Sequence, residues 1–171
     1  MMHAVLAAAL GVVLLGLATN TGAQAPGSGK ETQSIDRGRY LVRIGGCNDC
    51  HTAGYPEKAG AIPESEWLVG HGVGFHGPWG TTYPSNLRQM LNAMTEAEWI
   101  KRARQPMRPP MPWFALRDMN DQDLRDIHRY VKSIGSKGEP APAYLAPGVM
   151  PKTPYFDWNL KNLPAGAQSK P

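Results

Sequence analysis

The two cysteines of this 171-residue chain lie two residues apart, in the stretch GGCNDCHTAG that covers residues 45–54. His51 follows Cys50 directly, so the chain carries a C-x-x-C-H motif and no other thiol. This spacing occurs in disulfides, zinc sites, redox dithiols and covalent haem anchors. Because the whole cysteine content sits in one turn, the chemistry of that turn constrains what the rest of the chain can fold around.

The histidine after the second cysteine favours haem attachment over the other three uses. Two thiols at this spacing, on a turn that leaves a helix end, can reach the two haem vinyl groups, and the next residue can ligate the iron. Zinc needs two further ligands, which His71 or His76 would have to supply from a loop. A redox dithiol is expected among alternating strands and helices. We therefore expect haem on Cys47 and Cys50, with zinc and a redox dithiol as alternatives.

The N-terminus has the pattern of an export signal. An apolar run from Ala4 to Ala18 precedes the small, polar stretch TNTGAQA. Such a run suits a signal-peptide core and falls short of the roughly 20 residues that a membrane-spanning helix needs. We expect a signal peptide over residues 1–23, cleaved after Ala23, and a linker over 24–33. This predicts periplasmic localisation without a stable transmembrane span after processing; an uncleaved anchor is the alternative.

Three helices are expected after the linker. Ser34 can cap a helix that ends at the Gly45-Gly46 pair. Gly38 inside this helix is unfavourable for helix formation, so we expect a close helix crossing there. Thr95 and Glu98 form a capping box at the start of a second helix. The clearest helix can be capped by Asn120. It has a stripe of apolar residues at helical spacing, namely Leu124, Ile127, Val131 and Ile134. No strand is expected in the loop-rich residues 52–94.

Composition and charge narrow the class further. Glycine (19) and proline (16) make up about a fifth of the chain, which indicates short helices joined by long loops. The net charge of +4 would suit acidic proteins, anionic membranes or nucleic acid. However, no basic helix with interleaved aromatic residues is present, and we expect no nucleic-acid partner.

An electron carrier needs a sixth iron ligand, and a methionine thioether raises the reduction potential. Met111 is the best candidate, because prolines on both sides restrict its backbone. Met107, in the same proline-rich loop, is the alternative. The remaining methionines after the leader are expected to pack in the core or lie in the tail (Met90, Met94, Met119 and Met150). A second histidine ligand is a less favoured option; loop positions are expected for His71 and His76, and a partly exposed surface position for His128.

These pieces resemble the monohaem class I c-type cytochromes of bacterial periplasms. The similarity rests on GRYLVRIGGCNDCHTAG, GPWGTTYPSNLR, a W-x-x-x-x-R helix and RPPMPWFALRDMNDQDLRDIHRYVKSIG. The resemblance implies an all-α fold of short helices around one covalent haem over residues 34–135, followed by an extended proline-rich tail over 136–171 that packs on or near this domain. It also implies thioethers at Cys47 and Cys50, His51 as proximal ligand and Met111 as distal ligand.

By the same resemblance, the protein would be a periplasmic single-electron carrier and not an enzyme. Its partners would be a dehydrogenase donor and an oxidase or cytochrome acceptor. The residues themselves suggest the docking site: a basic run at Lys101, Arg102, Arg104 and Arg108, which departs from the family pattern, adjoins the loop of Met111, and we expect it to steer acidic partners there. One alternative is a cytochrome subunit of a periplasmic dehydrogenase complex, docked through an aromatic tail that includes Phe156 and Trp158. Another is a haem enzyme or gas sensor with an open sixth site.

Overall fold

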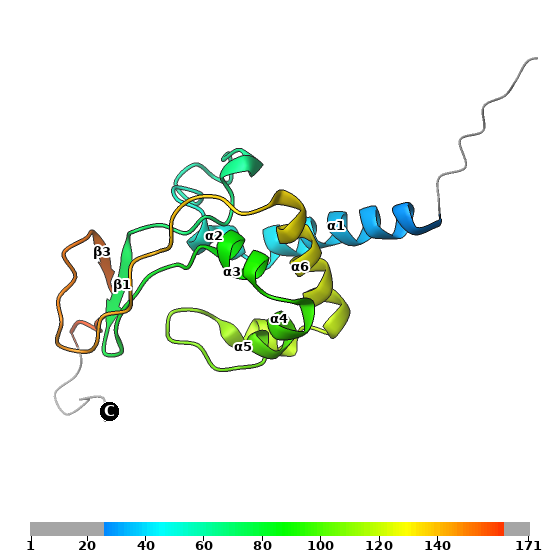
Figure 1. Ribbon diagram of the computed structural model, residues 1–171. Coiled ribbons are helices and arrows are strands. Elements are labelled where there is room, and N and C mark those ends of the chain that lie inside the picture. The colour runs from blue at the N-terminus through cyan, green and yellow to red at the C-terminus, as the bar shows by residue number, and fades with distance from the viewer. Residues whose placement is uncertain (1–25, 163–171) are drawn as a thin grey trace, which may run out of the picture.

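The computed structural model describes residues 26–162, and the expected signal peptide lies outside them (Figure 1). The elements in chain order are α1 (Pro26–Ile44), α2 (Cys47–His51), a 3-10 turn (Glu64–Glu66), β1 (Gly74–Gly77), β2 (Gly80–Thr82), α3 (Leu87–Ala93), α4 (Glu96–Ala103), α5 (Trp113–Asp118), α6 (Asp121–Ile134) and β3 (Tyr155–Asp157). Figure 1 places the strands at the opposite end of the molecule from the start of α1. Within residues 26–162, no helix is long and apolar enough to cross a membrane.

The helix α1 begins eight residues before the expected N-cap. It starts at Pro26, so Ser34 lies inside the helix. Proline is tolerated in a first helical turn, where its missing N–H is not needed. The hydroxyl of Ser34 is buried and hydrogen-bonds the carboxylate of Asp126 on α6. The capping prediction for Ser34 was therefore wrong, because this hydroxyl has a tertiary partner.

The crossing of α1 with α6 forms the main helix pair of the core. Gly38 lies at the crossing point, where an added Cβ would overlap the carbonyl of Asp126 and approach the Cβ of Tyr130 to 2.8 Å. The flanking Val42 and Ile127 are buried. The close helix approach expected at Gly38 is confirmed, and it explains why a residue unfavourable in a helix interior stands there.

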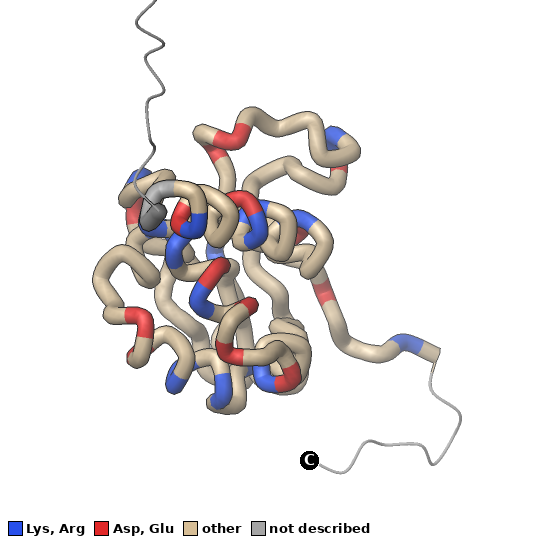
Figure 2. Tube along the Cα trace, turned by 90° about the vertical axis from the view of Figure 1, so that its right-hand side faces the viewer, with Lys and Arg blue, Asp and Glu red and all other residues tan. Residues whose placement is uncertain are grey.

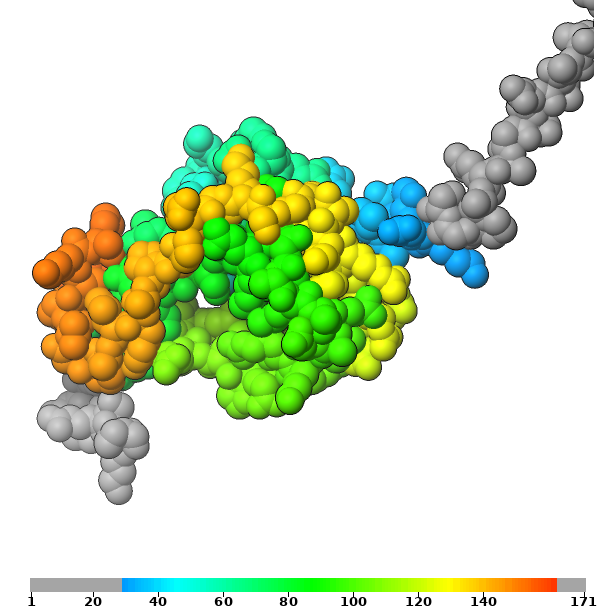
Figure 3. All heavy atoms as spheres, viewed as in Figure 1, coloured from blue at the N-terminus to red at the C-terminus, as the bar shows by residue number. Residues whose placement is uncertain are grey.

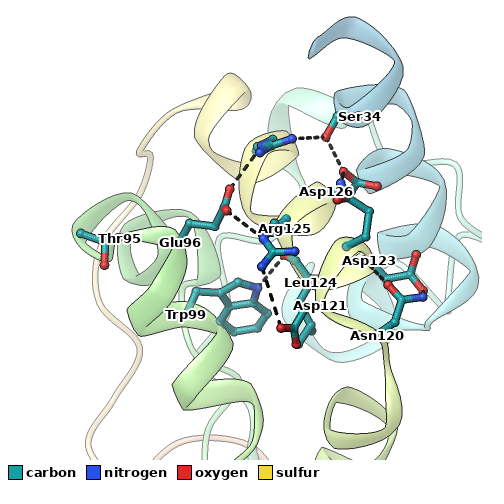
Figure 4. Close-up of polar contacts among 12 residues, drawn as sticks. Ser34, Thr95, Glu96, Trp99, Asn120, Asp121, Asp123, Leu124, Arg125 and Asp126 are labelled. Atoms are coloured by element: carbon teal, nitrogen blue, oxygen red, sulfur yellow. Dashed lines mark hydrogen bonds and ion pairs between the residues drawn. The ribbon is translucent and has the colours of Figure 1, made fainter. Parts of the chain in front are cut away.

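Helix α4 is attached to α6 through its first turns. The predicted capping box is confirmed: the Oγ1 of Thr95 accepts from the N–H of Glu98 (3.3 Å), and the Glu98 carboxylate accepts from the Thr95 N–H (2.8 Å). The indole N–H of Trp99 donates to the Leu124 carbonyl at 2.9 Å. Figure 4 shows Trp99 and Leu124 together with the carboxylate of Glu96, which forms ion pairs with Arg125 and with Arg129 on α6. The cap predicted at Asn120 also forms, with a hydrogen bond from the Asp123 N–H.

A three-stranded sheet departs from the expected all-α fold. The central strand β1 pairs antiparallel with β2 and parallel with β3. Phe75 lies opposite Thr82 on one side and opposite Phe156 on the other. Each strand has only three or four residues, which is too short to produce a recognisable alternation. The pairing of β1 with β3 also joins distant parts of the sequence, so no local sequence pattern predicts it.

Candidate functional site

A cavity of about 600 Å³ lies in the middle of the molecule. Its lining includes all four predicted site residues: Cys47, Cys50, His51 and Met111. The other lining residues are mostly apolar and come from helices and loops throughout the domain, among them Val42, Leu68, Leu91, Trp99, Leu116 and Ile127. The space-filling view shows a hollow between the orange C-terminal segment and the green central part of the chain (Figure 3).

The two cysteines lie on the five-residue helix α2. It follows Gly46, which has a left-handed backbone (φ 68°) that glycine adopts without cost. Thr52 follows the last residue of α2. Its hydroxyl donates to the buried Asn48 side chain (2.7 Å) and accepts from the Leu68 N–H (2.8 Å). These contacts tie the end of α2 to Leu68, which is buried in the core.

Cys47 and Cys50 form no disulfide with each other, and their thiols lie in an environment that favours the protonated form. Burial raises the pKa of Cys47 to about 11 and also raises the pKa of Cys50. A redox dithiol or a zinc site would favour lowered thiol pKa values, because the thiolate is the reactive and metal-binding form. Within residues 26–162, no group of three or more His, Cys, Asp or Glu side chains is placed to hold a metal ion. The environment therefore does not support the zinc and dithiol alternatives.

The ring of His51 is buried and oriented by a single hydrogen bond. Its Nδ1 lies 2.7 Å from the carbonyl oxygen of Ser85. A carbonyl only accepts, so Nδ1 carries the proton and Nε2 keeps its lone pair. Burial lowers the pKa of His51 despite an opposing contribution from this hydrogen bond. The imidazole is thus neutral, as a metal ligand must be.

The proline-rich loop of residues 104–112, here called the Met loop, brings Met111 and Met107 to the cavity. Met90 and Met119 also line the cavity while they pack against the core, so the core positions expected for them border the site. Met94 and Met150 do not line the cavity, and Met150 is exposed. Four methionines therefore line this space, and sequence reasoning had assigned two of them to packing alone.

The other described histidines do not line the cavity. The side chain of His71 accepts from the Val73 N–H (3.2 Å), and His76 hydrogen-bonds the Thr81 hydroxyl (2.8 Å). His128 is buried, and its Nε2 lies 3.0 Å from the Met94 carbonyl. The surface position expected for His128 was wrong, because α3 ends against this face of α6.

The basic cluster divides into residues with different roles. Arg104 donates to the carbonyls of Leu116 and Met119 at the end of α5 and pairs with Asp121 (2.7 Å). Arg108 lies over the ring of Tyr144, and Arg102 lines the cavity. Lys101 is exposed on α4. The four cations therefore do not form a uniform surface patch, and Figure 2 shows the two signs of charge interspersed along the chain.

Sequence reasoning expected the tail to pack on or near the domain, but it did not predict that the tail and the sheet line the cavity. Pro142, Tyr144 and Trp158 line the cavity from the C-terminal segment, and Phe75 lines it from β1. The only local signal was the run of aromatic residues in a proline-rich tail. The chemistry of the complete lining fits an iron porphyrin: paired thiols, a neutral imidazole and thioethers border a largely apolar space large enough for a flat macrocycle.

Comparisons with known proteins bear on this fit. The family model for cytochrome c matches residues 35–135. One of the subunits of the nicotinate dehydrogenase of Pseudomonas putida is 27% identical over 155 residues, which are 82% of this chain and 12% of that protein. The fructose dehydrogenase cytochrome subunit of Gluconobacter japonicus is 29% identical over 140 residues, 73% of this chain and 27% of that protein. The chain thus spans only a minor part of either relative. No solved structure matches the chain significantly.

Proposed function

Because the chain belongs to the cytochrome c family, we propose that it carries single electrons in the periplasm with histidine and methionine as axial haem ligands. The cofactor of this family is covalently bound haem c, whose iron supplies a one-electron couple. In this proposal Cys47 and Cys50 form the thioethers, and His51 and Met111 ligate the iron. The observation that carries the proposal is that these four side chains, from segments 60 positions apart, line one cavity.

The protein residues have three tasks in this function. The Ser85 carbonyl fixes the tautomer and orientation of His51, which keeps the lone pair of Nε2 available. Buried apolar side chains such as Leu68 and Leu91 exclude water and favour the less charged ferrous state. The prolines that flank Met111 limit backbone movement, so the iron can change oxidation state with little rearrangement.

The partner proposed for this carrier is another redox protein of the exported compartment. Two of the four cations considered for docking have contacts within the protein: Arg104 donates to the Leu116 carbonyl, and Arg108 lies over the ring of Tyr144. Lys101 is exposed, and Arg102 borders the cavity. We assign the steering of acidic partners to Lys101 and Arg102, next to the Met loop.

Production in a host that attaches haem c tests the proposal. The denatured protein should have the mass of the processed polypeptide plus one haem, and the colour should stay with the polypeptide after acid-acetone extraction. A variant with Cys47→Ala and Cys50→Ala should be colourless under the same treatment. A colourless wild-type protein at the unmodified mass would overturn the assignment.

A second candidate function is that of a cytochrome subunit within a dehydrogenase complex. Two observations favour it: both relatives carry the names of dehydrogenase subunits, and the tail exposes large apolar side chains. Phe156 and Trp158 are each 51% exposed, and Leu160 is 75% exposed. In this role the tail would contact the catalytic subunit, and the haem would receive electrons from that subunit.

The two functions differ in the size of the native assembly. The protein should be isolated from its own organism under mild conditions and followed by its haem absorbance during gel filtration. Elution as a monomer no larger than the 18.6 kDa of the full chain plus one haem, with no dehydrogenase activity in those fractions, supports the free carrier. Co-elution of haem with a dehydrogenase activity, lost when Phe156 and Trp158 are replaced by serine, supports the subunit.

A further inference from the structure

We infer that the C-terminal segment of residues 136–162 clamps the Met loop, with Tyr144 as a positioning residue for Met111. This inference rests on the proposed ligation of the haem iron by Met111. The matched range of the family model ends at residue 135, so the clamp lies outside the cytochrome c domain as the family defines it. In this inference the tail has a role at the haem site, which is to position the Met loop.

Tyr144 contacts the Met loop and the β-hairpin at once. The guanidinium carbon of Arg108, three residues before Met111, lies 4.0 Å from the centre of the Tyr144 ring. At this distance a cation is attracted by the face of the ring. The Tyr144 hydroxyl donates to the carbonyl of Trp79 at 2.7 Å, in the turn between β1 and β2. One side chain therefore links the loop to the sheet, and it also lines the cavity.

The backbone next to Tyr144 is held firmly. Leu145 and Thr81 exchange two hydrogen bonds, at 2.8 and 3.0 Å, and Thr81 is fully buried. The neighbouring Gly80 has φ 95°, and a Cβ there would overlap the Leu145 carbonyl. The tail thus approaches the hairpin as closely as a glycine allows. Because its backbone is fixed at this point, Tyr144 can restrain the loop and does not simply follow it.

The Met loop depends on contacts of this kind. Four of its residues are prolines without an N–H group (Pro106, Pro109, Pro110 and Pro112). The hairpin supports the loop through a hydrogen bond from the Thr82 hydroxyl to the Pro109 carbonyl, at 2.7 Å. The hairpin thus holds one side of the loop directly, and the tail holds Arg108 through Tyr144. Both contacts lie within three residues of Met111.

The test measures how readily the distal ligand is displaced in the ferric holoprotein. Added imidazole competes for the iron, and the far-red charge-transfer band of methionine-ligated ferric haem reports the ligand that remains. Tyr144→Leu should bind imidazole more tightly than wild type by on the order of tenfold, since both contacts are lost. Tyr144→Phe keeps the ring and Arg108→Gln keeps the hydroxyl, so each should show a smaller change.

Tyr155→Leu is the matched control. Tyr155 lies in the same tail with nearly the same exposure as Tyr144 (39% against 38%), but it does not line the cavity. Its imidazole affinity should equal that of wild type. Equal affinities for Tyr144→Leu, Tyr155→Leu and wild type would overturn the clamp alone. A wild-type protein that lacks the far-red band would overturn the ligand assignment, and the clamp with it.

Discussion

The Nδ1 of His51 lies 2.7 Å from the carbonyl oxygen of Ser85, which follows it by 34 positions. This contact joins the C-x-x-C-H turn to the segment before α3 and decides which imidazole nitrogen carries the proton. The Nε2 atom is left unprotonated on a buried ring that lines the cavity. The orientation of the proposed proximal ligand is therefore set by the backbone before any metal binds.

Replacement of His51 by glutamine should remove the proximal ligand and leave the two thiols in place. We expect the yield of haem-bearing protein to fall at least tenfold, because an unligated haem is poorly held and no other histidine of residues 26–162 lines the cavity. The measurement is the haem content per polypeptide in a pyridine haemochrome assay. His71→Gln is the control, since His71 does not line the cavity; equal losses in the two variants would contradict the assignment of His51.

The distal ligand can be assigned by comparing two methionines of one loop. Met111→Leu and Met107→Leu change side chains of similar volume that both line the cavity. We expect Met111→Leu to abolish the far-red band and to lower the reduction potential by on the order of 0.1 V, since the thioether favours the ferrous state. Met107→Leu should retain the band.

The reverse pattern would assign the ligand to Met107. Retention of the band in both variants would direct attention to Met90 and Met119, which also line the cavity. A high-spin ferric spectrum in the wild type would favour the alternative of an enzyme or sensor with an open sixth site.

The features that the sequence predicted correctly are those with local signals. The C-x-x-C-H turn needs only five consecutive residues, and the Thr95–Glu98 capping box needs four. The close crossing at Gly38 also left a local sign, because a glycine inside an otherwise regular helix needs a tertiary reason. Each of these predictions follows from the chemistry of neighbouring residues.

The features that were missed depend on partners far along the chain. Phe75 and Phe156 stack with ring centres 5.4 Å apart but are 81 positions apart in sequence. The buried ring of His128 hydrogen-bonds the Met94 carbonyl, and the hydroxyl of Ser34 inside α1 hydrogen-bonds Asp126 on α6. Arg108 is exposed, as expected for docking, but its contact with the ring of Tyr144 in the tail was not predicted. Contacts between such distant residues produce no periodic sequence pattern in either segment, so they could not be predicted from the sequence.

Charge reversal at Lys101 tests the proposed steering of partners. Lys101 is exposed on α4 beside Arg102, which borders the cavity. Lys101→Glu should slow electron transfer to an acidic redox protein several-fold at low ionic strength, and the difference should disappear in concentrated salt. Stopped-flow kinetics over a salt series measures this effect. Lys152→Glu, an exposed tail position, is the control, and an equal effect of both changes would show that only net charge matters.

The packing of α1 on α6 is tested by two glycines of the same helix. At Gly38 an added methyl group would overlap the Asp126 carbonyl and crowd Tyr130, whereas at Gly29 nothing lies within 4 Å. Gly38→Ala should lower the free energy of unfolding by about 2 kcal/mol or more, because two packed backbones would have to separate. Gly29→Ala should leave it unchanged or raise it by up to about 1 kcal/mol, through the better helix propensity of alanine. Denaturant titration of the holoprotein measures both, and a Gly38→Ala variant as stable as Gly29→Ala would show that the helices do not cross at this contact.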